Sequence, residues 1–129
     1  MIRILFVDND IQMLDAAGNY LSWWGFKVDK LRDSSRVVSS LAKNEYDILI
    51  CGVFSEPFDG FRLCEIIRRS PEPKVNQTKI VLIAPKEPAL DKYVALKRLN
   101  VFFMPRYASI GEWAQKIDSI LQTKKVTQK

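Results

Sequence analysis

The residues that could do chemistry in this chain stand at the ends of its apolar segments. Those that follow the inner segments are Asp8, Asn9, Gly52, Ala84 and Arg106. In open sheets of parallel strands, sites form just beyond the carboxyl ends of the strands, so these five residues define the expected site. Gly52 brings no side chain to it, and Ala84 brings no hydrogen-bond donor. The sequence contains no histidine, which excludes a histidine-ligated metal and a histidine general base.

The segment Ile48 to Cys51 predicts the central strand that positions this site. It is an unbroken apolar run, which is typical of a parallel strand covered by helices on both faces. Buried strands are also predicted at 2–7, 80–84 and 101–104, and a shorter strand nearer the sheet edge is predicted at 26–31.

Apolar residues three and four positions apart predict helices between these strands. The first helix is capped by Asp10 and stopped by Gly25. Its packed stripe is predicted to be Ile11, Leu14, Ala17, Leu21 and Trp24. Trp23 and Trp24 are about 100° apart on this helix, so at least one of them is expected to be partly exposed.

The later helices raise three further expectations. Arg68 is predicted to lie nearer the solvent-exposed side of the third helix. Residues 70–77 hold two prolines without periodicity and are predicted to form a connector. The fourth helix is predicted to have Pro88 in its first turn, with Leu90, Val94 and Leu96 or Lys97 near its packing boundary.

Strand and helix alternate in five pairs, which predicts one α/β domain with a parallel sheet and helices on both sides. The length of 129 residues, with 47% hydrophobic and 27% charged residues, fits one globular domain. Residues 1–123 are assigned to this domain, and residues 124–129 to a polar tail or the start of a linker.

Charge and hydropathy limit the functional classes. No apolar stretch approaches the roughly 20 residues of a membrane helix and no signal peptide is visible, so a cytoplasmic protein is expected. The net charge of +5 is spread along the chain without a nucleic-acid-binding motif, which favours a solvated basic surface over a nucleic-acid site. Cys51 and Cys64 lack metal-ligand spacing and are expected to be buried, inert thiols in a reducing compartment.

Three short segments together indicate a family. They are Ile-Leu-Phe-Val-Asp-Asn-Asp at 4–10, Tyr-Asp-Ile-Leu-Ile at 46–50, and Asp59-Gly60 at the head of a helix. Their order and spacing resemble those of the receiver domain of response regulators, the CheY-like superfamily, over essentially the whole chain. The resemblance implies a flavodoxin-like (βα)5 three-layer sandwich whose five-stranded parallel sheet has the order 2-1-3-4-5.

The resemblance also implies a mechanism. A receiver of this family takes a phosphoryl group from a histidine kinase onto an aspartate at the end of its third strand. Two acidic residues after the first strand hold Mg²⁺. A Thr or Ser ending the fourth strand and a Lys near the end of the fifth bind phosphoryl oxygens. An aromatic residue on the fifth strand moves with the Thr or Ser when the domain switches.

This chain departs from that apparatus at four positions. Gly52 falls at the phosphoacceptor position and cannot form an acyl phosphate. Asn9 replaces the second acidic residue, and Ala84 replaces the Thr or Ser. Arg106 aligns with the Lys, an exchange that keeps the charge but changes the geometry of the donors.

Two residues keep part of the pattern. Asp8 matches the first acidic residue and is expected to cap the first helix or to hydrogen-bond near it. The alternative is that Asp8 belongs to a weakened Mg²⁺ site. No other cofactor is expected. Phe103 aligns with the switch aromatic but lacks a hydroxyl partner.

The Lys position has a second possible alignment. If Pro105 is matched to the proline that usually follows the Lys, Met104 takes the Lys position and the charge is lost.

The sequence therefore predicts a pseudo-receiver of a two-component or phosphorelay pathway, a phosphorylation-independent protein-interaction module and not an enzyme. Its expected partners are proteins of that pathway, such as a histidine kinase or an output protein. The alternatives are a conventional phosphoaccepting receiver and, less favoured, a small-ligand, flavin or nucleic-acid binder on the same fold. Asp59, Ser55 and Cys51 are disfavoured as substitute phosphoacceptors.

Family members signal mainly through the fourth helix, fifth strand and fifth helix, a face that could also hold a homodimer. On this chain the predicted switch and interaction surface comprises Tyr93, Lys97, Phe102, Phe103 and Trp113. Core packing is the alternative role for its aromatic residues.

Overall fold

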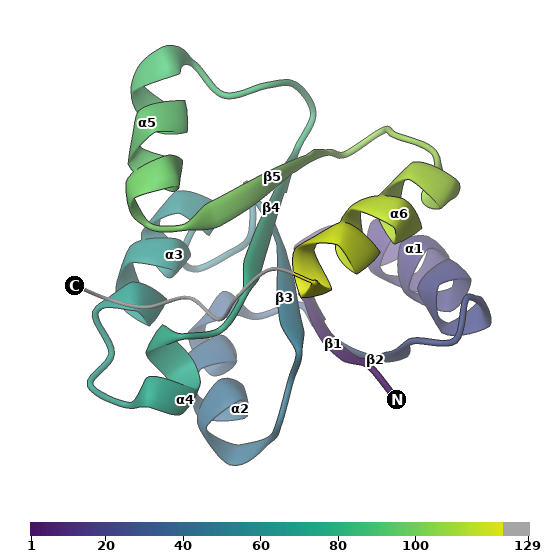
Figure 1. The fold of residues 1–129 in the computed structure, drawn as a ribbon, viewed down its shortest axis with the longest axis horizontal. Helices are drawn as coiled ribbons and strands as arrows, with labels where there is room; N and C mark the ends of the chain where they lie inside the picture. Colours follow the sequence, from purple (N-terminus) through teal and green to yellow (C-terminus); the bar gives the residue numbers. More distant parts are fainter. Residues whose placement is uncertain (123–129) are drawn as a thin grey trace.

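The computed structural model describes residues 1–122 and contains one sheet between two layers of helices (Figure 1). The strands are β1 (Arg3–Val7), β2 (Lys27–Leu31), β3 (Ile48–Gly52), β4 (Ile80–Ala84) and β5 (Val101–Pro105). All neighbouring strands pair in parallel, in the order β2-β1-β3-β4-β5. The predicted fold class and strand order are confirmed.

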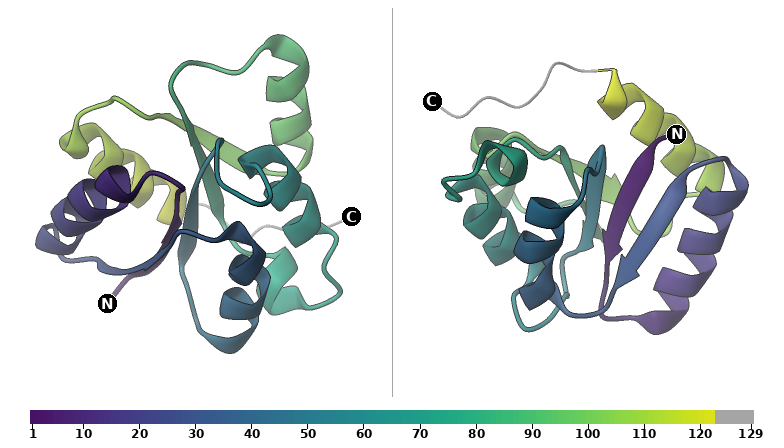
Figure 2. Two further views of the ribbon diagram at one scale, coloured as in Figure 1. Left: turned by 180° about the vertical axis from the view of Figure 1, so that it is seen from behind. Right: turned by 90° about the horizontal axis from the view of Figure 1, so that it is seen from below.

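The helices cover both faces of the sheet. They are α1 (Ile11–Trp23), the 3-10 helix η1 (Ser34–Arg36), α2 (Val37–Lys43), α3 (Gly60–Arg68), α4 (Pro73–Asn76), α5 (Leu90–Arg98) and α6 (Ile110–Leu121). α1 and α6 lie side by side on one face, and α2, α3, α4 and α5 cover the other (Figures 1 and 2). This arrangement buries both faces of the inner strands.

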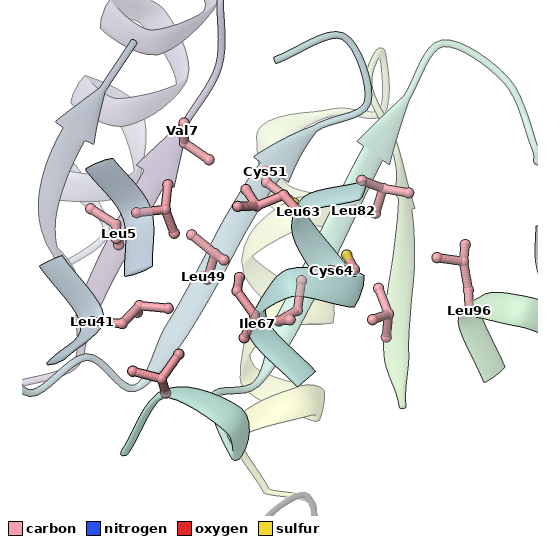
Figure 3. Close-up of a cluster of buried hydrophobic side chains, with 14 residues drawn as sticks. Leu5, Val7, Leu41, Leu49, Cys51, Leu63, Cys64, Ile67, Leu82 and Leu96 are labelled. Carbon is pink, nitrogen blue, oxygen red and sulfur yellow. The ribbon is translucent and has the colours of Figure 1, made fainter. Parts of the chain in front are cut away.

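The core consists of two clusters, one on each face of the sheet. Successive side chains of a strand point to opposite faces, so Leu49 and Cys51 join one cluster while Ile48 and Ile50 join the other. Figure 3 shows residues of α3, among them Ile67, directed toward the first of these faces. Every residue of β3 and β4 is buried, as the continuous apolar runs predict.

The packed stripe of α1 is shorter than predicted. Leu14, Ala17 and Leu21 are buried as expected, but Ile11 and Trp24 are each 50% exposed. Both stand at the ends of the helix, Ile11 as its first residue and Trp24 as its C-cap. The sequence pattern extended the packed face one position too far at each end.

The connector and the fourth predicted helix also differ from expectation. Residues 70–77 contain the four-residue helix α4, which begins at Pro73. α5 begins at Leu90, so Pro88 lies before the helix and not in its first turn. Leu90 is 78% exposed and Val94 is 41% exposed, because α5 packs at the β5 edge of the sheet, mainly through Leu96.

The prediction that Arg68 lies nearer the solvent-exposed side of α3 is wrong. It is buried, and its guanidinium donates four hydrogen bonds to backbone carbonyls, those of Asn76 (3.0 Å), Thr78 (2.6 Å), Leu99 (2.6 Å) and Asn100 (3.1 Å). Burial lowers its pKa to about 10, which keeps the group charged at neutral pH. Arg68 therefore joins the α4–β4 and α5–β5 connections to the end of α3.

Cys51 and Cys64 are both buried and unbridged, which confirms the predicted burial of the two thiols. A hydrogen bond with Cys64, together with burial, raises the pKa of the Cys51 thiol. None of the helices within residues 1–122 has the length and apolar character needed to cross a bilayer. The predicted tail at 124–129 lies outside the described residues.

Candidate functional site

The site at the carboxyl edge of the sheet is closed by an ion pair between Asp8 and Arg106. Arg106 Nη1 lies 2.7 Å from Asp8 Oδ2, and Nη2 lies 3.3 Å from Asp8 Oδ1. Both side chains are withdrawn from solvent, at 4% exposure for Asp8 and 10% for Arg106. This two-pronged geometry is the strong form of a carboxylate–guanidinium contact.

The strands place these two side chains from opposite sides of the site. The Asp8 N–H follows β1 and donates to the Leu31 carbonyl of β2, at 3.1 Å. The Arg106 N–H follows β5 and donates to the Ala84 carbonyl of β4, at 2.8 Å. In the strand order, β3 and β4 separate β1 from β5, and they end in Gly52 and Ala84. Because these two residues are small, the Arg106 side chain can reach across them.

The Asp8 carboxylate lies directly against Gly52. A Cβ added at Gly52 would collide with the Asp8 carboxylate, whose Cγ would lie only 2.9 Å away. The start of α3 is similarly tight, since a Cβ on Gly60 would lie 2.9 Å from the Gly52 carbonyl oxygen. The space in which a side chain at position 52 would begin is therefore occupied by the Asp8 carboxylate.

Asp10 extends the ion pair to the start of α1. Its Oδ2 lies 3.4 Å from Arg106 Nη2, while its Oδ1 accepts the N–H groups of Gln12 and Met13, as the predicted N-cap. The Asp10 N–H donates to Asp8 Oδ1 at 2.8 Å, so Asp8 has the hydrogen-bonding role expected of it near the first helix. Burial opposes the charge of Arg106, but Asp8 and Asp10 outweigh it and raise the Arg106 pKa.

The residues present do not fit a Mg²⁺ ion. Both oxygens of Asp8 are held by Arg106 or by the Asp10 N–H, and the guanidinium brings a positive charge to the position of a cation. Asn9 is exposed and adds no charge. Within the described part of the chain, no group of three or more His, Cys, Asp or Glu side chains is placed to hold a metal ion.

The predicted switch surface is only partly a surface. Tyr93 is 45% exposed on α5, and the Lys97 Nζ lies 5.8 Å from the centre of its ring. Phe102 and Phe103 are half-buried on β5. Trp113 is buried at 2% exposure, which contradicts its place on the predicted surface.

Trp113 instead supports the end of β5. Its Nε1 donates to the Pro105 carbonyl at 2.9 Å, and its ring packs against Phe6, 6.1 Å away between centroids. Pro105 directly precedes Arg106, so Trp113 helps to fix the direction from which the guanidinium enters the site. The apolar spacing of α6 places Trp113 on the packed face of that helix with Ile117 and Ile120, and all three are buried, but nothing in the sequence pairs Trp113 with Pro105.

Two buried serines that the sequence did not connect hold the loop between β3 and α3. The hydroxyl groups of Ser55 and Ser34 donate to the Phe58 carbonyl at 2.8 and 2.9 Å, and Ser34 Oγ accepts the Phe58 N–H at 2.8 Å. Ser55 is 2% exposed, so its hydroxyl is not available as a nucleophile. The loop also presents Phe54 to solvent, at 67% exposure.

Comparison with known proteins finds curated relatives of low sequence identity. No family model matches it. It is 26% identical to the regulatory protein VanRc of Enterococcus gallinarum over 94 residues, which cover 73% of this chain and 38% of that protein. The chain spans less than half the length of the curated relatives it matches.

Solved structures show the same fold. The chemotaxis response regulator CheY4 of Vibrio cholerae gives a TM-score of 0.82 at 17% identity, covering 93% of this chain and 98% of that one. A two-component response regulator from Clostridium difficile gives a TM-score of 0.81 at 18% identity, covering 95% of this chain and 97% of that one.

Proposed function

We propose that this chain, by its fold a receiver domain of the response-regulator (CheY-like) type, is a pseudo-receiver that binds protein partners without being phosphorylated on aspartate. One observation supports this above all. The Asp8 carboxylate, held by Arg106, lies against Gly52 in the space where an acceptor side chain would begin. A receiver built in this way has neither an acceptor nor room for one.

The ion pair gives this proposal a mechanism. In a conventional receiver, a cation and a phosphoryl group supply opposite charges at this edge of the sheet when the domain is modified. Here Arg106 and Asp8 supply both charges from the chain itself and join the ends of β5 and β1. We expect the domain to stay in one conformation, with Ala84 offering no hydroxyl to draw Phe103 into a second one.

The proposed partners are proteins of a two-component pathway, such as a histidine kinase or an output protein. The part of the predicted surface that remains accessible, Tyr93 and Lys97 of α5, is one candidate contact. Phe54 and Tyr107, which are 67% and 79% exposed, closely follow Gly52 and Arg106 in the chain and are further candidate contacts for a partner. Binding through these residues would not require the site to open.

A small phosphodonor tests the proposal directly. After incubation with acetyl phosphate and Mg²⁺, the intact mass of the chain is expected to be unchanged, while a conventional receiver treated in parallel gains one phosphoryl group. Millimolar Mg²⁺ is also expected to leave the unfolding temperature unchanged, because Arg106 already neutralises Asp8. A stable phosphoryl adduct on any aspartate of this chain would refute the proposal.

Gly52→Asp alone is not expected to restore phosphorylation. The new side chain would collide with Asp8, and Asn9 and Ala84 would still withhold an acidic ligand and a hydroxyl donor. Loss of one transition-state donor commonly costs about 100-fold or more in rate, so phosphorylation by acetyl phosphate should stay at least about 100-fold below that of a conventional receiver. A normal rate from this single change would mean that the site is more intact than proposed.

A further inference from the structure

The closed site lies on the face of the sheet that α1 and α6 cover (Figures 1 and 2). Residues two positions apart on a strand point to the same face. Phe6 of β1 and Met104 of β5 belong to the core cluster on that face. Asp8 and Arg106 follow them by two positions, and their N–H groups still bond to the neighbouring strands. The Asp8–Arg106 ion pair therefore closes the carboxyl end of this cluster.

Trp113 of α6 lies in the same cluster and contacts both strands that carry the ion pair. Its ring packs against Phe6, which stands two residues before Asp8. Its Nε1 donates to the carbonyl of Pro105, which directly precedes Arg106. The contacts form a closed circuit, because the ion pair joins the ends of β1 and β5 and Trp113 joins the same two strands one step below.

The short segment between Arg106 and Trp113 is held by backbone hydrogen bonds. The Ala108 N–H donates to the Pro105 carbonyl at 3.4 Å, which closes a turn. Ser109 is the N-cap of α6, and its carbonyl accepts the Trp113 N–H at 3.0 Å. A displacement of Arg106 at one end of this segment is therefore passed to Trp113 at the other.

We propose that Trp113 is a positioning residue that couples the closed ion pair to α6. Opening of the pair and release of Trp113 from the Pro105 carbonyl are then one event. This inference concerns the regulation of the site, and it rests on the closed ion pair from which the function above was proposed. It does not depend on whether an aspartate of the chain can be phosphorylated.

Burial makes this event all-or-none. Arg106 is 10% exposed, so its guanidinium reaches solvent when the turn that carries it moves, and the Pro105 carbonyl moves with that turn. Trp113 would then hold a buried N–H without its acceptor, and leaving a buried donor unsatisfied is costly. The closed and open arrangements are thus two alternatives, with the closed one as the resting state.

The coupling makes α6 the element that responds to the state of the site. Ala84 has no hydroxyl to act on Phe103, but the route through Trp113 needs none. Coupling between two sites is reciprocal, so a partner that holds α6 in place would stabilise the closed ion pair by the same factor by which the pair favours that partner. Binding at α6 and closure of the site would therefore support each other.

The fluorescence and the indole exchange of Trp113 test the coupling. In a chain carrying Trp23→Phe and Trp24→Phe, both at exposed positions, Trp113 is the single tryptophan. Asp8→Asn keeps the size of the side chain but removes the charge that holds Arg106, and it is expected to shift the Trp113 emission to longer wavelength. It should also speed exchange of the Trp113 indole N–H at least about tenfold relative to the backbone amides of α2.

Asp29→Asn is the matched control, because it breaks the 3.2 Å ion pair between Arg3 and Asp29 at the amino end of β1. It should leave the Trp113 emission and the relative indole exchange unchanged. Arg106→Met opens the closed pair from the other side and should reproduce the changes expected of Asp8→Asn. Unchanged Trp113 signals in both variants of the closed pair, or an equal change in Asp29→Asn, would overturn the proposal.

A double-mutant cycle separates coupling from general loosening. Trp113→Phe keeps a ring against Phe6 but removes the donor to Pro105. With Trp113 in place, Asp8→Asn should speed exchange of the α6 backbone amides relative to those of α2, whereas in the Trp113→Phe background it should change them by less than about twofold. Equal effects in the two backgrounds would contradict the coupling. A phosphoryl adduct in the mass test above would refute the pseudo-receiver without altering this result, so the two proposals fail separately.

Discussion

Gly52→Ala is expected to destabilise the domain by about 2–4 kcal/mol, although it adds a single methyl group. The new Cβ would occupy the position of the Asp8 carboxylate and push it away from Arg106. Overpacking of a buried position alone costs about 1–3 kcal/mol. Separating a buried charge from its partner adds to that cost, because Arg106 would keep only its longer contact with Asp10.

Urea unfolding of matched variants checks this expectation. Gly111→Ala is the control, because the nearest neighbouring atom to its added Cβ would be 4.0 Å away, and it should change stability by less than about 1 kcal/mol. The cause can be isolated in the Asp8→Ala background, where Gly52→Ala should cost much less since no carboxylate remains to be displaced. An equal cost in both backgrounds would show that Asp8 is not what excludes a side chain at position 52.

The fold was predictable because its signals are local. Continuous apolar runs identified β3 and β4 as inner strands, and every residue of both is buried. The ends of elements were less certain, because the apolar pattern cannot show where a helix passes beyond the sheet that it covers. That is why Ile11 and Trp24 on α1, and Leu90 on α5, are exposed despite fitting an apolar stripe.

The composition of the site was predictable, but its geometry was not. Counting from strand ends brought Asp8, Gly52 and Arg106 to one edge of the sheet. The ion pair joins residues 98 positions apart, and no local pattern reveals that the Asp8 carboxylate fills the space at Gly52. Glycine at that position was evidence of a missing acceptor, and the structure adds that the Asp8 carboxylate occupies the space where a side chain would begin.

Arg68 shows the same limit for a buried charge. On a helical pattern, an arginine beside Arg69 at the end of α3 is assigned to solvent. The acceptors that make burial of the Arg68 guanidinium possible are backbone carbonyls of two connections distant in the sequence. Every residue has a backbone carbonyl, so a sequence pattern cannot indicate which of them will accept these hydrogen bonds. Asn100 supplies one of these carbonyls and has a φ of 56°, which is a left-handed backbone conformation. Arg68 therefore hydrogen-bonds to a turn whose backbone conformation is uncommon for a residue other than glycine.

Arg68→Met is expected to destabilise the domain by about 3–5 kcal/mol, the largest effect expected of any single change outside the site. Methionine can fill much of the volume but donates no hydrogen bond, so four backbone carbonyls would lose a charged donor at once. Each buried acceptor left without a partner costs about 1–3 kcal/mol, reduced where water can enter. The midpoint of urea unfolding measures the loss.

Arg69→Met is the matched control, because the neighbouring side chain is 76% exposed and makes only a 3.9 Å ion pair with Glu65. Such surface pairs contribute about 0–1 kcal/mol, so this variant should unfold close to the wild type. Arg68→Lys separates charge from geometry: an ammonium keeps the charge but cannot span carbonyls from two connections as the planar guanidinium does, so most of the loss should remain. If Arg68→Lys were as stable as the wild type, the burial of charge and not the guanidinium geometry would hold the two connections.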